Sequence, residues 1–261
     1  MRPNRIRELW EADQPVLNGW LAIPHSFSAE VMAHQGFDSV TMDLQHGMID
    51  YSDAPPILAA ISTTSSMPMC RVPWNDPALL MKMLDAGCYG VICPMVNSVE
   101  EAQRLVEATR YPPMGQRSFG PIRASLYGGS DYGQKANETV VILAMVETRA
   151  ALESVEQIVA VEGLDGVYVG PNDLALSLGL HAHFDSEEPI MLEALDRIIQ
   201  AARSQGKQAG IHCGSVSYAK RMIEQGFRLV TVGSDARFIS QGATQVLQDF
   251  RSDASGKALA Y

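Results

Sequence analysis

Short apolar runs alternate with helix-like periods along almost the whole chain, and this rhythm constrains the fold more than any other feature. The runs are continuously apolar, as expected for parallel strands that are covered on both faces. They lie near Trp20–Ile23, Ser39–Asp43, Met69–Val72, Gly90–Pro94, Val140–Val146, Gly166–Gly170, Gln208–His212 and Leu229–Gly233. We therefore expect eight parallel strands.

Helical patterns separate these runs, and several of them stop at a glycine, the usual residue just after a helix end. The predicted helices are Ser28–Gln35, Asp53–Ser62, Asp76–Ala86, Ser98–Thr109, Thr148–Val161, Pro189–Gln205, Ser215–Gln225 and Ala236–Asp249. Eight strand and helix units predict an α/β protein built as a (β/α)8 TIM barrel. An open doubly wound sheet would require a GxGxxG after an early strand, and the chain has none.

The length of 261 residues suits one such barrel, so we expect a single domain over residues 1–261. Arg5–Ala12 is predicted to form a short extra helix that could close the bottom of the barrel. Tyr111–Asn137 breaks the rhythm, because it is rich in Gly, Pro, Arg and Ser and shows no clear helix. A connection of this length is usually functional or lies at a contact.

The charge and the cysteine content limit which partners and which cellular compartment we expect for this protein. The net charge of −10 argues against nucleic acid or an anionic membrane as the main partner. Cys70, Cys88, Cys93 and Cys213 show no CxxC spacing, so we expect buried free thiols in a reducing cytoplasm. The N-terminus lacks the apolar stretch of a signal peptide, and no run has the length of a membrane span. The predicted location is therefore cytoplasmic.

Two carboxylates follow consecutive strand-like runs, Glu147 after Val140–Val146 and Asp173 after Gly166–Gly170. Active sites of barrels lie at the C-terminal ends of the strands, where these two side chains could meet. Two carboxylates fill part of the shell of a hard divalent cation and leave room for water and a bidentate substrate. The alternative is structural: Glu147 would pair with an arginine and Asp173 would cap the next helix.

Other polar residues lie at the same predicted end, whereas the opposite end offers no comparable cluster. Arg71 suits a carboxylate or a developing oxyanion, or else a salt bridge at the rim. His46 with Asp43 nearby is a common general acid/base arrangement, or else a rim hydrogen bond. His212 is expected to be a core histidine with satisfied hydrogen bonds. No lysine lies at a strand exit, which argues against a Schiff-base mechanism.

Several segments together resemble the metal-dependent (class II) 2-keto-acid aldolases of the 4-hydroxy-2-oxoheptanedioate and 2-dehydro-3-deoxyglucarate aldolase type. The resemblance covers nearly the whole chain. It rests on Gly36-Phe37-Asp38, Asp43-x-x-His46, Arg71-Val-Pro-Trp-Asn-Asp-Pro77, Pro94-Met95-Val96, Ala108–Gly115, Glu147-Thr148-Arg149 and Gly170-Pro171-x-Asp173-Leu174. It implies a barrel of the phosphoenolpyruvate/pyruvate-binding type and reversible aldol cleavage of a 4-hydroxy-2-oxo acid.

The resemblance also implies roles for individual residues. Glu147 and Asp173 would ligate Mg²⁺, Mn²⁺ or Co²⁺, and Arg71 would contact the pyruvate moiety near its keto oxygen. His46 would act as acid/base, with Asp43 beside it. Asp85 would reach the site of a neighbouring subunit in a homohexamer, a trimer of dimers that exchange a helix. The backbone of Pro171, Asn172 and Asp173 would hold the substrate carboxylate.

The chain departs from the family pattern at two positions, since Gln45 replaces a frequent Glu and Met145 replaces a frequent Gln. The same enolate chemistry would serve an oxaloacetate decarboxylase or an aldolase that uses hydroxypyruvate. A CoA-ester lyase of the citrate-lyase-β kind would need a basic groove, which the acidic balance disfavours. The alternative from a different functional class is a non-catalytic barrel that binds a ligand or a partner.

Overall fold

Eight parallel strands close into one barrel in chain order, as the sequence predicts. The computed structural model describes residues 1–254, so residues 255–261 of the predicted domain lie outside the described part. The strands are β1 (Val16–Leu21), β2 (Ser39–Asp43), β3 (Met67–Arg71), β4 (Gly90–Cys93), β5 (Val141–Val146), β6 (Gly166–Val169), β7 (Gln208–Cys213) and β8 (Leu229–Val232). Only β1 begins well before its apolar run, because the polar Asn18 interrupts that pattern.

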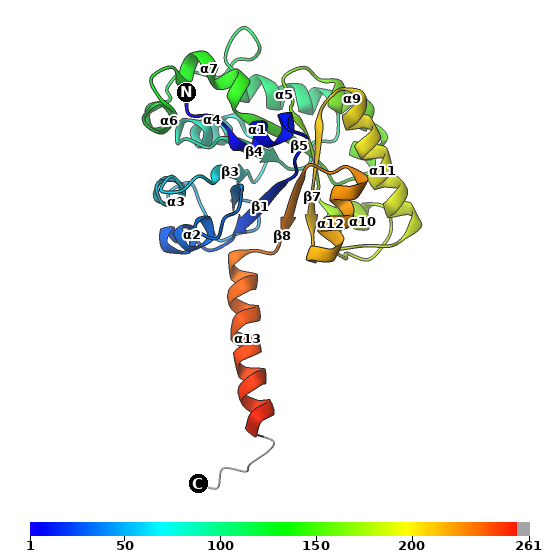
Figure 1. The fold of residues 1–261 in the computed structure, drawn as a ribbon. Coiled ribbons are helices and arrows are strands. Elements are labelled where there is room, and N and C mark those ends of the chain that lie inside the picture. The colour runs from blue at the N-terminus through cyan, green and yellow to red at the C-terminus, as the bar shows by residue number, and fades with distance from the viewer. Residues whose placement is uncertain (255–261) are drawn as a thin grey trace.

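Helices cover the outside of the barrel, except that α1 lies at its bottom and α13 extends away from it (Figure 1). They are α1 (Arg5–Glu11), α2 (Ser26–Ala33), α3 (Ala54–Ile61), α4 (Pro77–Asp85), α5 (Val99–Thr109), α6 (Ile122–Gly128), α7 (Tyr132–Thr139), α8 (Arg149–Glu153), α9 (Val155–Ala160), α10 (Pro171–Ser177), α11 (Pro189–Ser204), α12 (Val216–Gln225) and α13 (Asp235–Ala254). Within residues 1–254, none of them is long and apolar enough to cross a bilayer.

Three helical details differ from the sequence-based expectation. The segment predicted to lack a helix, Tyr111–Asn137, contains α6 and most of α7, so that prediction is wrong. Both are short, and Ile122 and Leu126 of α6 are exposed, so no buried apolar period marks this helix in the sequence. The helix predicted over Thr148–Val161 is divided at Ser154 into α8 and α9, and α10 was not predicted.

The strands bury both faces, and their residues alternate between two apolar clusters. In β5, Val141, Leu143 and Met145 belong to the cluster inside the barrel. Their neighbours Ile142, Ala144 and Val146 pack outward, against the helices. Side chains along a strand point to opposite faces with a period of two. This alternation decides which residues at the strand ends can reach the mouth of the barrel.

The first and the last helix lie in different positions relative to the barrel. Ile6 of α1 joins the inner cluster and closes the bottom of the barrel, as predicted. The long helix α13 instead leaves β8 and projects away from the barrel wall (Figure 1).

All four cysteines are free and buried, which confirms the expectation of buried thiols.

Candidate active site

The inward-facing series of four strands continue into polar residues at the C-terminal mouth of the barrel. In each strand every second residue faces inward. The inward-facing residues are 39, 41 and 43 of β2; 67, 69 and 71 of β3; 141, 143 and 145 of β5, followed by 147 at its exit; and 208, 210 and 212 of β7. The last members of these series are Asp43, Arg71, Glu147 and His212. Alternation therefore brings residues far apart in the sequence to one opening.

Asp43 and Arg71 form a buried, two-pronged ion pair. The register of β2 and β3 sets Asp43 directly beside Arg71. Arg71 Nε donates to Asp43 Oδ1 at 2.9 Å, and its Nη2 donates to Oδ2 at 2.6 Å. Trp20 Nε1 donates to the same Oδ2 at 3.1 Å, and the guanidinium lies 4.9 Å from the Trp20 ring centroid. These contacts fix the direction of the Arg71 fork.

Asp43 also anchors the turn that carries His46. Its Oδ1 accepts hydrogen bonds from the backbone N–H groups of Gln45 and His46. Burial opposes ionisation, but the hydrogen bonds and charge of Arg71 outweigh it and hold the pKa of Asp43 below its usual value. The His46 side chain is exposed, and no described residue bonds to its ring. The Asp43 carboxylate therefore holds both the backbone of His46 and the guanidinium of Arg71.

Glu147 is held at the mouth by the backbone of the β4 loop. Its Oε1 accepts the Met95 N–H at 2.7 Å, and Met95 adopts a left-handed φ of 55° to direct that group. A positive φ is unusual for a residue with a long side chain. Asn97 secures this turn, since its Nδ2 donates to Met95 O and Thr148 Oγ1 bonds to its Oδ1. Met95 acts through its backbone, so its residue type gave no signal in the sequence.

The second carboxylate, Asp173, lies in the first turn of α10, close enough for its charge to act on Glu147. Burial raises the pKa of Glu147, the Met95 hydrogen bond opposes this, and Asp173 raises the pKa further. Two like charges that act on each other are unfavourable unless a cation offsets them. Gly170 leaves the space, because a Cβ there would lie 2.5 Å from Glu147 Oε2.

The donor set fits a hard divalent cation. Glu147 Oε2 makes no hydrogen bond to a described residue, while Oε1 is used by Met95. The described residues contain no cluster of three or more His, Cys, Asp or Glu side chains able to hold a metal ion. The protein would thus supply two carboxylates and leave the remaining ligand positions to water and substrate.

His212 forms part of the wall of the same mouth and is more exposed than the core histidine that the sequence suggested. Its ring makes a T-shaped contact with Trp20, with centroids 5.0 Å apart, and stacks on Phe184 at 5.4 Å. Burial, together with the charge of Arg71, lowers the pKa of His212 to about 4. The lowered pKa favours the neutral form of the ring.

Asp85 ends α4 and lies apart from these groups in its own chain. Its Oδ1 accepts a hydrogen bond from Arg117 Nη2 at 2.7 Å. Arg117 is itself buried, and its guanidinium lies 4.4 Å from the Tyr111 ring centroid. The pair ties the loop before α6 to α4, and Asp85 remains partly exposed.

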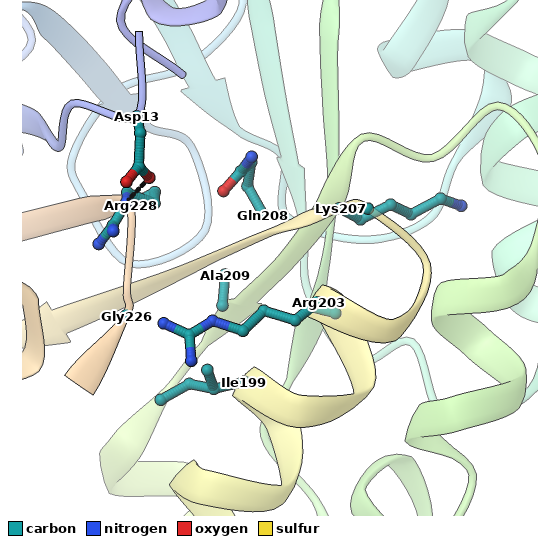
Figure 2. Close-up of a pocket in the computed structure, with 10 residues that line it drawn as sticks. Asp13, Ile199, Arg203, Lys207, Gln208, Ala209, Gly226 and Arg228 are labelled. Carbon is teal, nitrogen blue, oxygen red and sulfur yellow. Dashed lines mark hydrogen bonds and ion pairs between the residues drawn. The ribbon is translucent and has the colours of Figure 1, made fainter. Parts of the chain in front are cut away.

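The opposite end of the barrel is also charged, contrary to expectation, but its groups are already engaged. A hollow of about 320 Å³ lies there, and Figure 2 shows residues that line it, among them Asp13, Arg203, Lys207 and Arg228. Arg228 pairs with Asp13 at 2.7 Å, and Lys207 Nζ donates to Val161 O at 2.6 Å. Arg203 Nη2 donates to Gln225 O at 3.3 Å. These cations satisfy helix-end carbonyls and a carboxylate, as expected of structural residues.

Comparison with known proteins identifies the family. Residues 18–241 match the model of the HpcH/HpaI aldolase/citrate lyase family. The hydroxypyruvate/pyruvate aldolase of Rhizorhabdus wittichii is 45% identical over 95% of this chain and 99% of its own length. The 4-hydroxy-2-oxo-heptane-1,7-dioate aldolase of Shigella flexneri is 35% identical over 97% of this chain and 95% of its own length.

A solved structure supports the same assignment. A HpcH/HpaI aldolase/citrate lyase family protein from Burkholderia cenocepacia superposes with a TM-score of 0.87 at 33% identity, and the match covers 94% of this chain and 98% of that protein. The fold, the mouth residues and these matches agree with the resemblance seen in the sequence. The chain therefore belongs to the HpcH/HpaI aldolase/citrate lyase family and is an aldolase-type lyase built on a (β/α)8 barrel.

Proposed function

We propose that this enzyme catalyses the reversible aldol cleavage of a 4-hydroxy-2-oxo acid, giving an aldehyde and pyruvate or a related 2-oxo acid such as hydroxypyruvate. The observation that carries the proposal is the combination, at one mouth, of the carboxylates Glu147 and Asp173 with the oriented guanidinium of Arg71. Cleavage of this kind leaves an enolate, and Arg71 and a cation held by the two carboxylates would offset its negative charge. The names of the relatives from R. wittichii and S. flexneri describe substrates of this class.

Glu147 and Asp173 would hold the divalent ion, Mg²⁺, Mn²⁺ or Co²⁺. When bound, the ion supplies Lewis acidity at the substrate's keto oxygen and offsets the charge of the two carboxylates. The first-turn backbone of Pro171, Asn172 and Asp173 lies next to these ligands at the start of α10. Proline has no N–H, but the N–H groups of Asn172 and Asp173 lack acceptors within the helix, so they can receive the substrate carboxylate.

Arg71 would stabilise the negative charge that develops on the keto oxygen. Its Nε and Nη2 are held by Asp43, which fixes the guanidinium, and its Nη1 makes no hydrogen bond to a described residue. Preorganised donors contribute most when they need no rearrangement during the reaction. Trp20 beneath the guanidinium and Asp43 beside it are the positioning residues for this task.

His46 would take the proton from the C4 hydroxyl during cleavage and return it during condensation. Its ring is exposed at the mouth, and the Asp43 carboxylate fixes its backbone. Asp43 would act as a positioning residue for Arg71 and the His46 turn, because both of its oxygens already accept hydrogen bonds from protein groups. Asp85, held by Arg117, would reach the active site of a neighbouring subunit.

The experiment that tests the proposal is pyruvate release from a 4-hydroxy-2-oxo acid, followed with a lactate dehydrogenase assay. After EDTA treatment we expect no release, and we expect release to return with Mg²⁺, Mn²⁺ or Co²⁺. Pyruvate formed at full rate in EDTA would contradict the metal assignment. No pyruvate with any metal would contradict the aldolase assignment, and oxaloacetate would be the next compound because its decarboxylation needs the same enolate.

We also propose that two copies of the chain exchange α13 within a homohexameric, cytoplasmic enzyme. Ile239, Val246 and Phe250 form an exposed apolar stripe along one side of α13, which projects from its own barrel (Figure 1). An apolar groove of about 720 Å³ lies between α2 and the start of α13, lined by Phe27, Val31 and Phe238 among others. In a barrel the last helix normally covers the wall beside β8 and β1. A reciprocal exchange would cover both apolar surfaces, as in other domain-swapped dimers.

Placing a charge on the stripe is expected to separate the subunits. Val246→Glu puts a carboxylate into the proposed interface, where desolvation without a partner is costly. We expect a smaller assembly by size-exclusion chromatography with light scattering. The matched control is Gln248→Glu, which adds the same charge on the opposite side of α13 and should leave the assembly unchanged. A Val246→Glu protein of unchanged mass would contradict the exchange.

A further inference from the structure

Asp235, the first residue of α13, is a buried carboxylate that joins α13 to α2 and to the loop after β1. Its Oδ1 accepts the Ala22 N–H at 2.8 Å, and its Oδ2 accepts the Ile23 N–H at 3.3 Å. Ser28 Oγ donates to Oδ2 at 2.9 Å, and the Ala236 N–H donates to Oδ1 at 2.8 Å. All of these donors are neutral, and together they supply the hydrogen bonds that a buried carboxylate requires.

The loop that Asp235 holds lies at the mouth of the barrel. Residues 22–25 connect the C-terminal end of β1 to α2, and active sites of barrels lie at this end of the strands. The four hydrogen bonds of Asp235 go to this loop, to α2 and to its own helix, and none goes to a group of the proposed site. Any effect of Asp235 on the reaction must therefore pass through the loop.

The loop is packed against the turn that carries His46, which spans residues 44–48 and is called the His46 turn. The Met48 N–H donates to Ala22 O at 2.9 Å. A Cβ at Gly47 would lie 3.1 Å from Ala22 Cα, so the backbones of the turn and the loop approach each other closely. Ala22 is therefore the residue through which the loop holds the turn.

The His46 turn has an anchor on each side of its histidine. On one side Asp43 Oδ1 accepts the His46 N–H, and on the other side Ala22 O accepts the Met48 N–H. Asp235 in turn holds the N–H of Ala22. Because the His46 ring makes no hydrogen bond to a described residue, its position depends on this backbone. A turn held on one side alone can pivot about that side, so both anchors are needed to fix the histidine.

We infer that Asp235 is a positioning residue for His46 and acts through the backbone of Ala22 and Met48. The inference rests on the proposed function, in which His46 takes the proton of the C4 hydroxyl. A base must lie within hydrogen-bond reach of the proton that it removes, and a small displacement has a large effect on the rate. The metal ligands and Arg71 bind the 2-oxo acid part of the substrate and are held by other contacts. Asp235 therefore serves the proton transfer and not the stabilisation of the enolate.

The test compares two reactions of Asp235→Ala. Aldol cleavage requires removal of a hydroxyl proton. Oxaloacetate decarboxylation releases CO₂ and forms the same enolate without such a step, and water then protonates the enolate. Both are followed as pyruvate release with Mg²⁺ present, after subtraction of the rate with metal alone. We expect kcat for cleavage to fall at least about tenfold with little change in KM, while decarboxylation stays within about twofold of the wild type. An equal fall in both reactions, or no fall in cleavage, would overturn the inference.

Two further variants test whether the hydrogen bond to Ala22 is responsible. Asp235→Asn keeps Oδ1 as the acceptor for the Ala22 N–H, so cleavage should return to within about threefold of the wild type. Ser28→Ala removes another donor to Asp235 but leaves the contact with Ala22, so both reactions should keep their wild-type rates. If Asp235→Asn were as slow as Asp235→Ala, the effect would belong to the charge, and the positioning role would be overturned.

Amide hydrogen exchange, measured by mass spectrometry, tests the anchor without any turnover. We expect the Met48 N–H to exchange about fivefold faster in Asp235→Ala, the effect of about one net hydrogen bond. The Met95 N–H, in the loop after β4, should exchange at the wild-type rate. Unchanged exchange at Met48 would overturn the inference. If the wild type releases no pyruvate from any 4-hydroxy-2-oxo acid, the proposed function fails, and exchange at Met48 then decides separately whether Asp235 holds the turn.

Discussion

Replacing Glu147 by glutamine is expected to lower the metal-dependent kcat more than about a thousandfold, because Lewis acid catalysis contributes several kcal/mol. The substitution removes one of only two carboxylates that the proposed metal site offers. The fold should persist, since the glutamine carbonyl can still accept the Met95 N–H at the position of Oε1. Burial and Asp173 already disfavour the charged form of Glu147, so a neutral side chain removes an unfavourable interaction when no metal is bound.

Thermal unfolding separates the loss of metal from loss of structure. We expect Glu147→Gln to unfold in EDTA at the wild-type temperature or slightly above it. Added Mn²⁺ should raise the unfolding temperature of the wild type, because a ligand that binds only the folded state stabilises it, and should not raise that of the variant. Glu153→Gln removes the same charge at an exposed position of α8 and serves as the control. Full activity of Glu147→Gln would exclude Glu147 as a metal ligand.

Replacing Arg71 by alanine is expected to reduce both activity and stability. Activity should fall at least about a hundredfold, as for the loss of other preorganised oxyanion donors. The free energy of unfolding should fall by about 3 kcal/mol or more, since Asp43 would remain as a buried carboxylate without its partner. The hydrogen bonds and charge of Arg71 keep the pKa of Asp43 low, so this contribution is present above the usual pKa of an aspartate and disappears as the pH falls through the lowered value.

A second substitution separates the two effects. Adding Asp43→Asn to Arg71→Ala removes the unpaired charge, so stability measured by denaturant unfolding should partly return while activity does not. Arg197→Ala is the control, because Arg197 makes the same two-pronged contact with Glu156 on the surface. An exposed pair of this kind contributes at most about 1 kcal/mol. Arg71→Ala with activity within a few fold of the wild type would contradict the role of Arg71.

The sequence by itself determined the architecture and the ends of the strands at which chemistry is found. Continuous apolar runs and the glycines after the helices predicted the eight strands, because parallel strands buried on both faces need such runs. Glu147 and Asp173 could be selected as a pair for the same reason, since each directly follows a predicted strand. The helices of Tyr111–Asn137 could not be predicted, because exposed Ile122 and Leu126 leave no amphipathic period to detect.

Only the tertiary structure decided how the groups at the mouth are coupled. The pairing of Asp43 with Arg71 depends on the register of β2 and β3, which side-chain pattern does not encode for strands that are buried on both faces. The hydrogen bond from Met95 to Glu147 uses a backbone group whose direction comes from one left-handed residue. The hydrogen bonds that join Asn18, Thr231 and Tyr168 connect β1, β8 and β6, which meet only when the barrel closes. Local residue patterns specify the elements, whereas closure of the barrel specifies which side chains meet and which protons they share.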